Sequence, residues 1–266
     1  MTGLSSFDFR AGAWLETSDG GSQAGAEEQI LQTSLIDAEV ADSWLMVEGR
    51  VRGLDRHWAR FAASCQEIGL DRQSLADAWA ALPAVLPSPG EWFPRLELRQ
   101  GSELWLLLRP APKVQKTVTA WIRGAHDPRV MPRRKGPELG LLGSLRAEAI
   151  AHGGQEAVLV DRDGYLLEGA YSSLLWWEGE TLCAVSDEAP ILGGVTRGLL
   201  LDLATEAGVA IRYARPRPED IADCEAWLVS ALHGVRSVTA WVDGGPPAGE
   251  IVRATTWQAR LEALMS

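Results

Sequence analysis

Leu192-Gly193-Gly194-Val195-Thr196-Arg197 joins a glycine turn to the start of a predicted helix. Backbone N–H groups at a helix N-terminus are unpaired and have the helix dipole behind them, so they can bind a phosphate that glycines allow to approach closely. Val195 and Thr196 would donate their amides, and the Thr196 hydroxyl could add a bond. The segment predicts a phosphate site, with an ordinary glycine loop before a capped helix as the alternative.

A second candidate is Lys135, one of only three lysines among 25 basic residues. The other two, Lys113 and Lys116, lie in a Pro-Lys-Val-Gln-Lys stretch that enters a predicted strand. Partial burial would lower the pKa of Lys135 and leave a neutral amine that can form a Schiff base with a carbonyl group. The alternative is a solvated lysine in a basic loop beside Arg133 and Arg134.

Glu168 is a third candidate because it follows the apolar pair Leu166-Leu167 and precedes Gly169. It therefore ends a strand that reads as buried, where a carboxylate needs a partner. A protonated ring nitrogen is one such partner. A helix cap or a surface turn is the alternative.

These segments occur in a characteristic order along the chain, namely Lys135, then Glu168-Gly169-x-x-Ser172-Ser173-Leu174, then the glycine turn at 192–197, then Ser230-Ala231-Leu232. The ordered set resembles the class IV aminotransferase superfamily, the fold-type IV pyridoxal-phosphate enzymes. That superfamily includes branched-chain and D-amino acid aminotransferases and the 4-amino-4-deoxychorismate lyases. The resemblance covers most of residues 43 to 242.

The resemblance implies pyridoxal 5'-phosphate as the cofactor and assigns a role to each matching residue. Lys135 looks like the lysine that holds the cofactor as a Schiff base and moves protons, and Glu168 like the carboxylate that keeps the ring nitrogen protonated. The stretch Leu54 to Phe61 resembles the family's His-x-x-Arg-Leu helix, in which Arg60 would clamp the phosphate. The other cofactor-binding residues that the resemblance implies are Ser172, Ser173, Val195, Thr196, Ser230 and Ala231.

The chain also departs from the family pattern. The tyrosine that usually follows the lysine in transaminases is missing from Gly136 to Gly140, Ser173 replaces a usual asparagine, and the Gly-Asp-Gly motif has no clear counterpart around Glu39 to Ser43. Ser230-Ala231-Leu232 resembles the Asn-Ala-Leu of the lyases, and the chain is short, as theirs are. We therefore expect a 4-amino-4-deoxychorismate lyase, with an amino acid transaminase as the alternative and a non-catalytic relative as a third possibility.

Two weaker candidates concern the substrate. His233 precedes Gly234 where the family's active-site loop would turn, so it could contact substrate or be a structural turn histidine. Arg123, with His126 and Arg129, could guide a carboxylate from the loop after a strand, but a solvated basic loop is the preferred interpretation.

The amino-acid composition limits which binding partners are expected. The formal charge is 25 − 36 = −11, and 46% of residues are hydrophobic. These values disfavour a disordered chain, and they disfavour nucleic acid and membrane surfaces as partners. The resemblance implies a small-molecule amino substrate. Three widely spaced cysteines without a Cys-x-x-Cys pair predict a reduced, cytoplasmic setting, and no His/Cys cluster supports a metal site. A homodimer is expected from the resemblance.

The pattern of strands and helices predicts an α/β protein with two sub-domains and mixed sheets of the α+β type. The resemblance implies the two-domain architecture of fold-type IV. We expect an N-terminal domain at 1–123, an interdomain loop at 124–134, and a C-terminal domain at 135–266 that carries the lysine. The predicted helices are 54–67, 71–82, 138–153, 196–208 and 255–265. The predicted strands, after short edge strands within the first forty residues, are 43–51, 92–99, 103–109, 118–123, 156–160, 165–167, 173–177, 181–185, 226–231 and 235–242.

Overall fold

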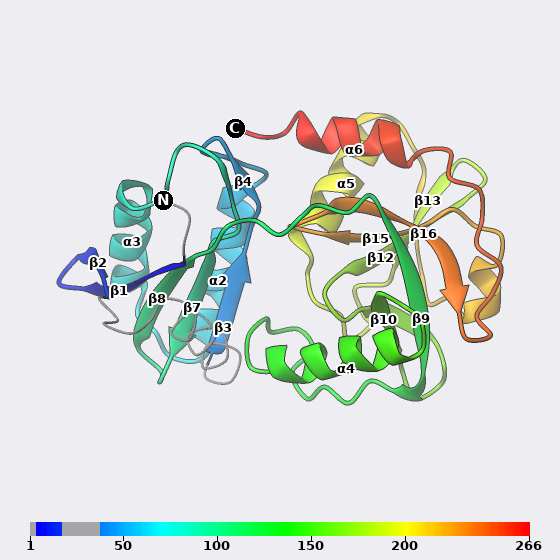
Figure 1. The fold of residues 1–266 in the computed structure, drawn as a ribbon, viewed down its shortest axis with the longest axis horizontal. Helices are drawn as coiled ribbons and strands as arrows, with labels where there is room; N and C mark the ends of the chain where they lie inside the picture. The colour runs from blue at the N-terminus through cyan, green and yellow to red at the C-terminus, as the bar shows by residue number, and fades with distance from the viewer. Residues whose placement is uncertain (1–3, 18–37) are drawn as a thin grey trace. The chain divides into compact units, whose positions relative to one another are not determined.

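A computed structural model describes residues 4–17 and 38–266, and the chain divides into two compact units (Figure 1). The first unit consists of Met1–Lys113, Arg134–Gly140 and Met265–Ser266, and the second of Val114–Arg133 and Leu141–Leu264. The chain thus enters the second unit before the predicted connection at 124–134 and returns to the first at Arg134. In this division Lys135 lies in the first unit, and the predicted domain bounds stay a prediction.

The first unit contains a five-stranded sheet in the order β2-β1-β8-β7-β3, with two helices packed on it through one shared apolar core. A small three-stranded sheet in the order β5-β4-β6 completes the unit. The elements are β1 (Ser5–Arg10), β2 (Ala13–Glu16), β3 (Ala38–Ser43), β4 (Met46–Val47), β5 (Arg50–Val51), α2 (Leu54–Glu67), α3 (Arg72–Ala81), the short 3₁₀ helix Leu82–Ala84, β6 (Glu91–Trp92), β7 (Arg95–Arg99) and β8 (Glu103–Leu108).

The helices of this unit follow from local sequence. His57, Phe61 and Cys65 recur every four residues and are the buried face of α2, which confirms the predicted helix. Asp71 caps α3 by accepting the Ser74 amide at 2.8 Å, as expected. The glycines at 20, 21 and 25, taken as turn signals, lie outside the described residues.

The prediction of one strand over 43–51 is wrong. The long strand β3 ends at Ser43, and two short strands follow. Glu48 and Gly49 have φ values of 50° and 77°, so they form a left-handed turn that splits the segment into the β4-β5 hairpin.

The second unit is built on an eight-stranded mixed sheet in the order β11-β10-β9-β16-β15-β12-β13-β14. Its elements are β9 (Thr117–His126), α4 (Leu139–Ala151, which begins in the first unit), β10 (Glu156–Val160), β11 (Leu166–Gly169), β12 (Ser173–Glu178), β13 (Thr181–Val185), α5 (Val195–Glu206), β14 (Ile211–Ala214), the 3₁₀ helix Pro218–Ile221, β15 (Ala226–Ser230), β16 (Gly234–Val242) and α6 (Ala254–Glu262). Apart from β14 and the 3₁₀ helix Pro218–Ile221, which the sequence did not predict, these agree with the predicted elements to within a few residues.

The sheet of the second unit has an apolar core on each face. Along β12, Leu174 and Trp176 join the core that contains α4, whereas Leu175 and Trp177 join the core that contains α5 and α6. This alternation follows from the two-residue period of a strand, and it places α5 and α6 across the sheet from α4 (Figure 1). Within the described residues, no helix has the length and apolar content needed to cross a bilayer.

Candidate active site

In the first unit, the backbone at Lys135 is fixed against strand β3. The Ala41 amide donates to the Lys135 carbonyl oxygen at 2.7 Å. Gly136 has φ +144°, and a Cβ there would lie 2.7 Å from the Cα of Val40. Only glycine permits this approach, so the Lys135-Gly136 pair sets where the lysine side chain begins.

Lys135 is half-buried, whereas Lys113 and Lys116 are exposed. Burial lowers the pKa of its amine to about 8, and the nearby guanidinium of Arg60 adds to that effect, while Asp42 opposes it. Arg95 and Arg109 also lower the pKa. The side chain is therefore not the solvated loop lysine that the sequence offered as the alternative.

Asp42, at the end of β3, anchors the charges around this lysine. Its carboxylate is fully buried and accepts from Arg60 Nε at 2.8 Å and Nη2 at 2.8 Å, and it lies 2.7 Å from His57 Nδ1. Burial opposes ionisation, yet Arg60 and His57 hold the pKa of Asp42 well below its usual range. Sequence reasoning missed Asp42, although an aspartate between the apolar pairs Val40-Ala41 and Trp44-Leu45 signals a buried carboxylate that needs partners.

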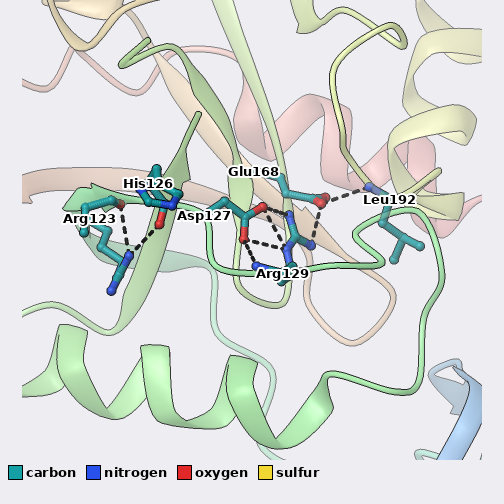
Figure 2. A network of polar contacts seen from close by, with 7 residues as sticks. Arg123, His126, Asp127, Arg129, Glu168 and Leu192 are labelled. Carbon is teal, nitrogen blue, oxygen red and sulfur yellow. Dashed lines mark hydrogen bonds and ion pairs between the residues drawn. The ribbon is translucent and has the colours of Figure 1, made fainter. Parts of the chain in front are cut away.

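In the second unit, Glu168 is buried, with 3% of its surface exposed, at the end of β11. Its Oε1 accepts from the Leu192 amide at 2.9 Å and from Arg129 Nη1 at 2.9 Å (Figure 2). Burial raises the pKa of Glu168 to about 7, and Arg129 works in the opposite direction. The alternative of a surface turn or helix cap at Glu168 is therefore wrong.

The start of α5 presents free helical amides. Gly194 precedes the helix without a side-chain cap, and the Gly198 amide donates to the Gly194 carbonyl oxygen at 3.0 Å. The amides of Val195, Thr196 and Arg197 come before that bond and so lack a partner within the helix. The helix dipole adds partial positive charge at the same place, which suits an anion.

The predicted residues of the second unit gather around this helix start. The Leu192 amide ties the preceding loop to Glu168, and a Cβ on Gly194 would collide with Ser173 Oγ. Ser173 pairs with Val229 in the sheet, so Ser230 and the turn residue Ala231 follow at the same end of β15. Ser172 Oγ is buried and has no hydrogen-bond partner within the described parts of the chain.

The substrate candidates are mostly engaged within the protein. Arg123 donates to the carbonyl oxygens of Ala125 and His126 at 3.1 and 2.7 Å. Arg129 is buried between Asp127 and Glu168, so the interpretation of a solvated basic loop is wrong for this residue. His233 Nδ1 accepts the amide of Gln115 at 3.1 Å, which gives it a structural role in its turn. A role for Arg123 or His233 in substrate binding stays a prediction.

Each unit, taken by itself, offers groups that match a different part of a pyridoxal phosphate molecule. The first offers an amine of lowered pKa for its aldehyde. The second offers a buried carboxylate for a ring nitrogen and, at the start of α5, uncapped amides for a phosphate. The unpartnered hydroxyl of Ser172 further indicates a polar ligand. Residues 4–17 and 38–266 contain no group of three or more His, Cys, Asp or Glu side chains able to hold a metal ion.

The family described as amino-transferase class IV matches residues 39–241, and the chain belongs to it. It is therefore a member of an enzyme family that uses pyridoxal phosphate.

Similarity to curated relatives is confined to part of the chain. The branched-chain-amino-acid aminotransferase of Escherichia coli is 32% identical over 101 residues, which are 37% of this chain and 32% of the relative. The aminodeoxychorismate lyase of Bacillus subtilis is 28% identical over 102 residues, which are 37% of this chain and 35% of that enzyme. The matched region thus spans about a third of each relative's length.

Solved structures share the fold over nearly the whole chain. A hypothetical aminotransferase from Mycobacterium tuberculosis in its PLP-bound form has a TM-score of 0.80 at 20% identity, and 98% of each chain is covered. A putative 4-amino-4-deoxychorismate lyase from Legionella pneumophila has a TM-score of 0.75 at 16% identity, covering 85% of this chain and 90% of that one. The predicted fold-type IV architecture is confirmed.

Proposed function

We propose that this chain binds pyridoxal 5'-phosphate through Lys135 and acts on a small amino substrate. The observation that carries the proposal is the half-buried amine of Lys135, with its pKa lowered to about 8. Such an amine is partly neutral near physiological pH, as attack on an aldehyde requires. Membership of the class IV family supports pyridoxal phosphate as the compound that carries the aldehyde.

The remaining residues would bind the cofactor and direct protons. In the second unit, the amides of Val195 and Thr196 would bind the phosphate. In the first unit, Asp42 orients the Arg60 guanidinium, to which the family resemblance assigns a phosphate contact. Both hydrogen bonds to Glu168 fall on Oε1, and Oε2 accepts none within the described residues, so Oε2 is the atom that would hold a ring N–H. When bound, the cofactor supplies an electron-withdrawing ring that stabilises negative charge on the substrate carbon next to nitrogen.

Proton transfer falls to Lys135 in either proposed reaction. With the cofactor bound, the Lys135 Nζ would be a base of suitable strength to remove a proton from the substrate carbon next to nitrogen. For 4-amino-4-deoxychorismate, loss of that proton and of the enolpyruvyl group leaves 4-aminobenzoate and pyruvate. We favour this lyase reaction because of Ser230-Ala231-Leu232, and the similarity to lyases from Bacillus and Legionella supports it.

A transaminase of the branched-chain or D-amino acid type is the second candidate. The similarity to the branched-chain enzyme of Escherichia coli favours it. There the Lys135 amine would return the proton that it removed, and hydrolysis by water would release a keto acid. The amino group would pass to an acceptor keto acid.

The two reactions are separated by their products. The purified protein with pyridoxal phosphate is given 4-amino-4-deoxychorismate, and 4-aminobenzoate and pyruvate are measured; in parallel it is given a panel of L- and D-amino acids with an acceptor keto acid. We expect 4-aminobenzoate release that is absent in Lys135→Ala. Transamination without lyase turnover would overturn the preference for the lyase, and a protein that takes up no pyridoxal phosphate would identify the non-catalytic relative.

We also propose that the protein acts as a cytoplasmic homodimer, which the family resemblance supports. Sedimentation of the purified chain at several concentrations measures the mass directly, and a monomer at all of them would refute the dimer.

A further inference from the structure

Glu168 belongs to a buried network of three charged side chains (Figure 2). Arg129 lies on the connection after β9 and bonds to Asp127 through Nε at 3.0 and 3.1 Å and through Nη2 at 2.8 Å, while its Nη1 reaches Glu168 Oε1 at 2.9 Å. The Arg129 amide also donates to Asp127 Oδ1 at 3.0 Å. Only 5% of the Arg129 side chain and 8% of the Asp127 side chain are exposed, so water screens this network poorly.

These three side chains are one positive charge short of neutrality, because Asp127 and Glu168 contribute two negative charges and Arg129 one positive charge. Strand β10 pairs Val158 with Gly169 and Val160 with Leu166 of β11, and the loop before α5 contributes the Leu192 amide to Glu168. A buried carboxylate without a full counter-charge holds a proton more strongly, in agreement with the pKa of about 7 for Glu168.

We propose that Asp127 and Arg129 are positioning residues that set, from opposite directions, how strongly Glu168 holds a proton, and through it the protonation of the cofactor's ring nitrogen. This inference rests on the proposed function, because it assigns the missing positive charge to the protonated ring nitrogen at Glu168 Oε2. Arg129 favours the carboxylate and also occupies Oε1, so that the other oxygen is left for the ring. Asp127 neutralises part of the Arg129 charge and holds the guanidinium in place.

Replacing Arg129 or Asp127 should therefore shift the protonation midpoint of Glu168 in opposite directions. In Arg129→Met the nearest cation is gone, and the midpoint should rise by about 1 to 3 pH units, the range for a close opposite charge. In Asp127→Asn the Arg129 guanidinium keeps its full charge, and the asparagine oxygen can still accept the Arg129 backbone amide. The midpoint of Glu168 should therefore fall by about 1 pH unit. Arg129→Lys keeps the charge without the forked geometry and should restore most of the wild-type midpoint.

The test measures this midpoint with and without the cofactor. In the protein without cofactor, the infrared band of the protonated carboxyl is followed against pH and assigned by its loss in Glu168→Gln. In the protein loaded with pyridoxal phosphate, the pH dependence of the visible absorption band is followed in the same variants. Opposite shifts in Arg129→Met and Asp127→Asn, with rescue by Arg129→Lys, support the proposal in both states.

Two other outcomes are distinguishable. Shifts of the same sign, or none, in folded variants would overturn the proposal, because a purely structural role disturbs the site in one direction whichever residue is removed. If Arg129→Met does not fold, Asp127→Asn and Arg129→Lys still test the proposal. A Glu168 midpoint that Asp127→Asn leaves unmoved would contradict the proposal by itself. Failure to bind pyridoxal phosphate would refute the proposed function. The infrared titration would still show whether Asp127 and Arg129 control the protonation of Glu168.

Discussion

The lowered pKa of Lys135 predicts unusual amine reactivity at neutral pH. With a pKa of about 8, roughly one quarter of the amine is neutral at about pH 7.5, against about one in a thousand for an ordinary lysine at 10.4. Replacing Arg60 by methionine removes a cation that lowers this pKa and leaves Asp42, which raises it, less compensated. Each unit by which the pKa then rises reduces the neutral amine about tenfold.

The chain is well suited to measuring this reactivity. Because Lys113 and Lys116 are the only other lysines, a trace amount of an acylating reagent can be applied across a pH series to protein without cofactor, and each lysine quantified by peptide mass spectrometry. Lys135 should reach its reactivity midpoint near pH 8 in the wild type and at a higher pH in Arg60→Met, with the exposed Lys113 and Lys116 as internal references in each sample. A Lys135 midpoint near 10 in the wild type, or one that Arg60→Met leaves unmoved, would refute the electrostatic reasoning.

Three further changes test other parts of the structure. Asp42→Asn removes the buried carboxylate that holds Arg60 and His57 and should cost about 3 to 5 kcal/mol in the free energy of unfolding, measured by urea denaturation. A loss below about 1 kcal/mol would contradict a stabilising role for this carboxylate. Gly136→Ala places a Cβ 2.7 Å from the Cα of Val40, so it should lower the free energy of unfolding by more than about 1 kcal/mol and weaken cofactor binding. Unchanged stability and binding would contradict the close approach. The pKa of Glu168 is raised from 4.5 to about 7 in the folded protein, so its ionised form is disfavoured in the native state. The free energy of unfolding should therefore fall by about 3 kcal/mol as the pH rises through that interval. Glu168→Gln should remove this fall, and an identical pH slope in both proteins would contradict the raised pKa.

Periodic apolar spacing was enough to predict most of the helices and strands. The helical spacing of apolar residues from Leu54 to Cys65 placed α2 correctly, and turn residues at Gln100 to Ser102 placed the β7-β8 hairpin. The segment 43–51, predicted as a strand ending near Gly49, failed because a left-handed pair at Glu48-Gly49 turns the chain back into a second short strand. Local spacing carries no information about that backbone conformation.

The candidate site, like the fold, could be predicted only in part. Its motif residues could be selected from their order along the chain, but their charged partners could not, since these depend on contacts distant in sequence. Asp42 meets Arg60 across 18 residues and Arg129 meets Glu168 across 39. Arg129 in particular lies in a polar, proline-containing stretch that is typical of a solvated loop, and only the three-dimensional structure reveals its burial.

The central claim, that Lys135 is the amine that binds pyridoxal phosphate, is tested most directly by reducing the loaded protein with borohydride and mapping the modified peptide. The account predicts a visible absorption band that disappears on reduction, and one phosphopyridoxyl group located on Lys135. It also predicts that Lys135→Ala shows neither the band nor the adduct. A stable adduct on Lys113 or Lys116, or an undiminished band in Lys135→Ala, would contradict it.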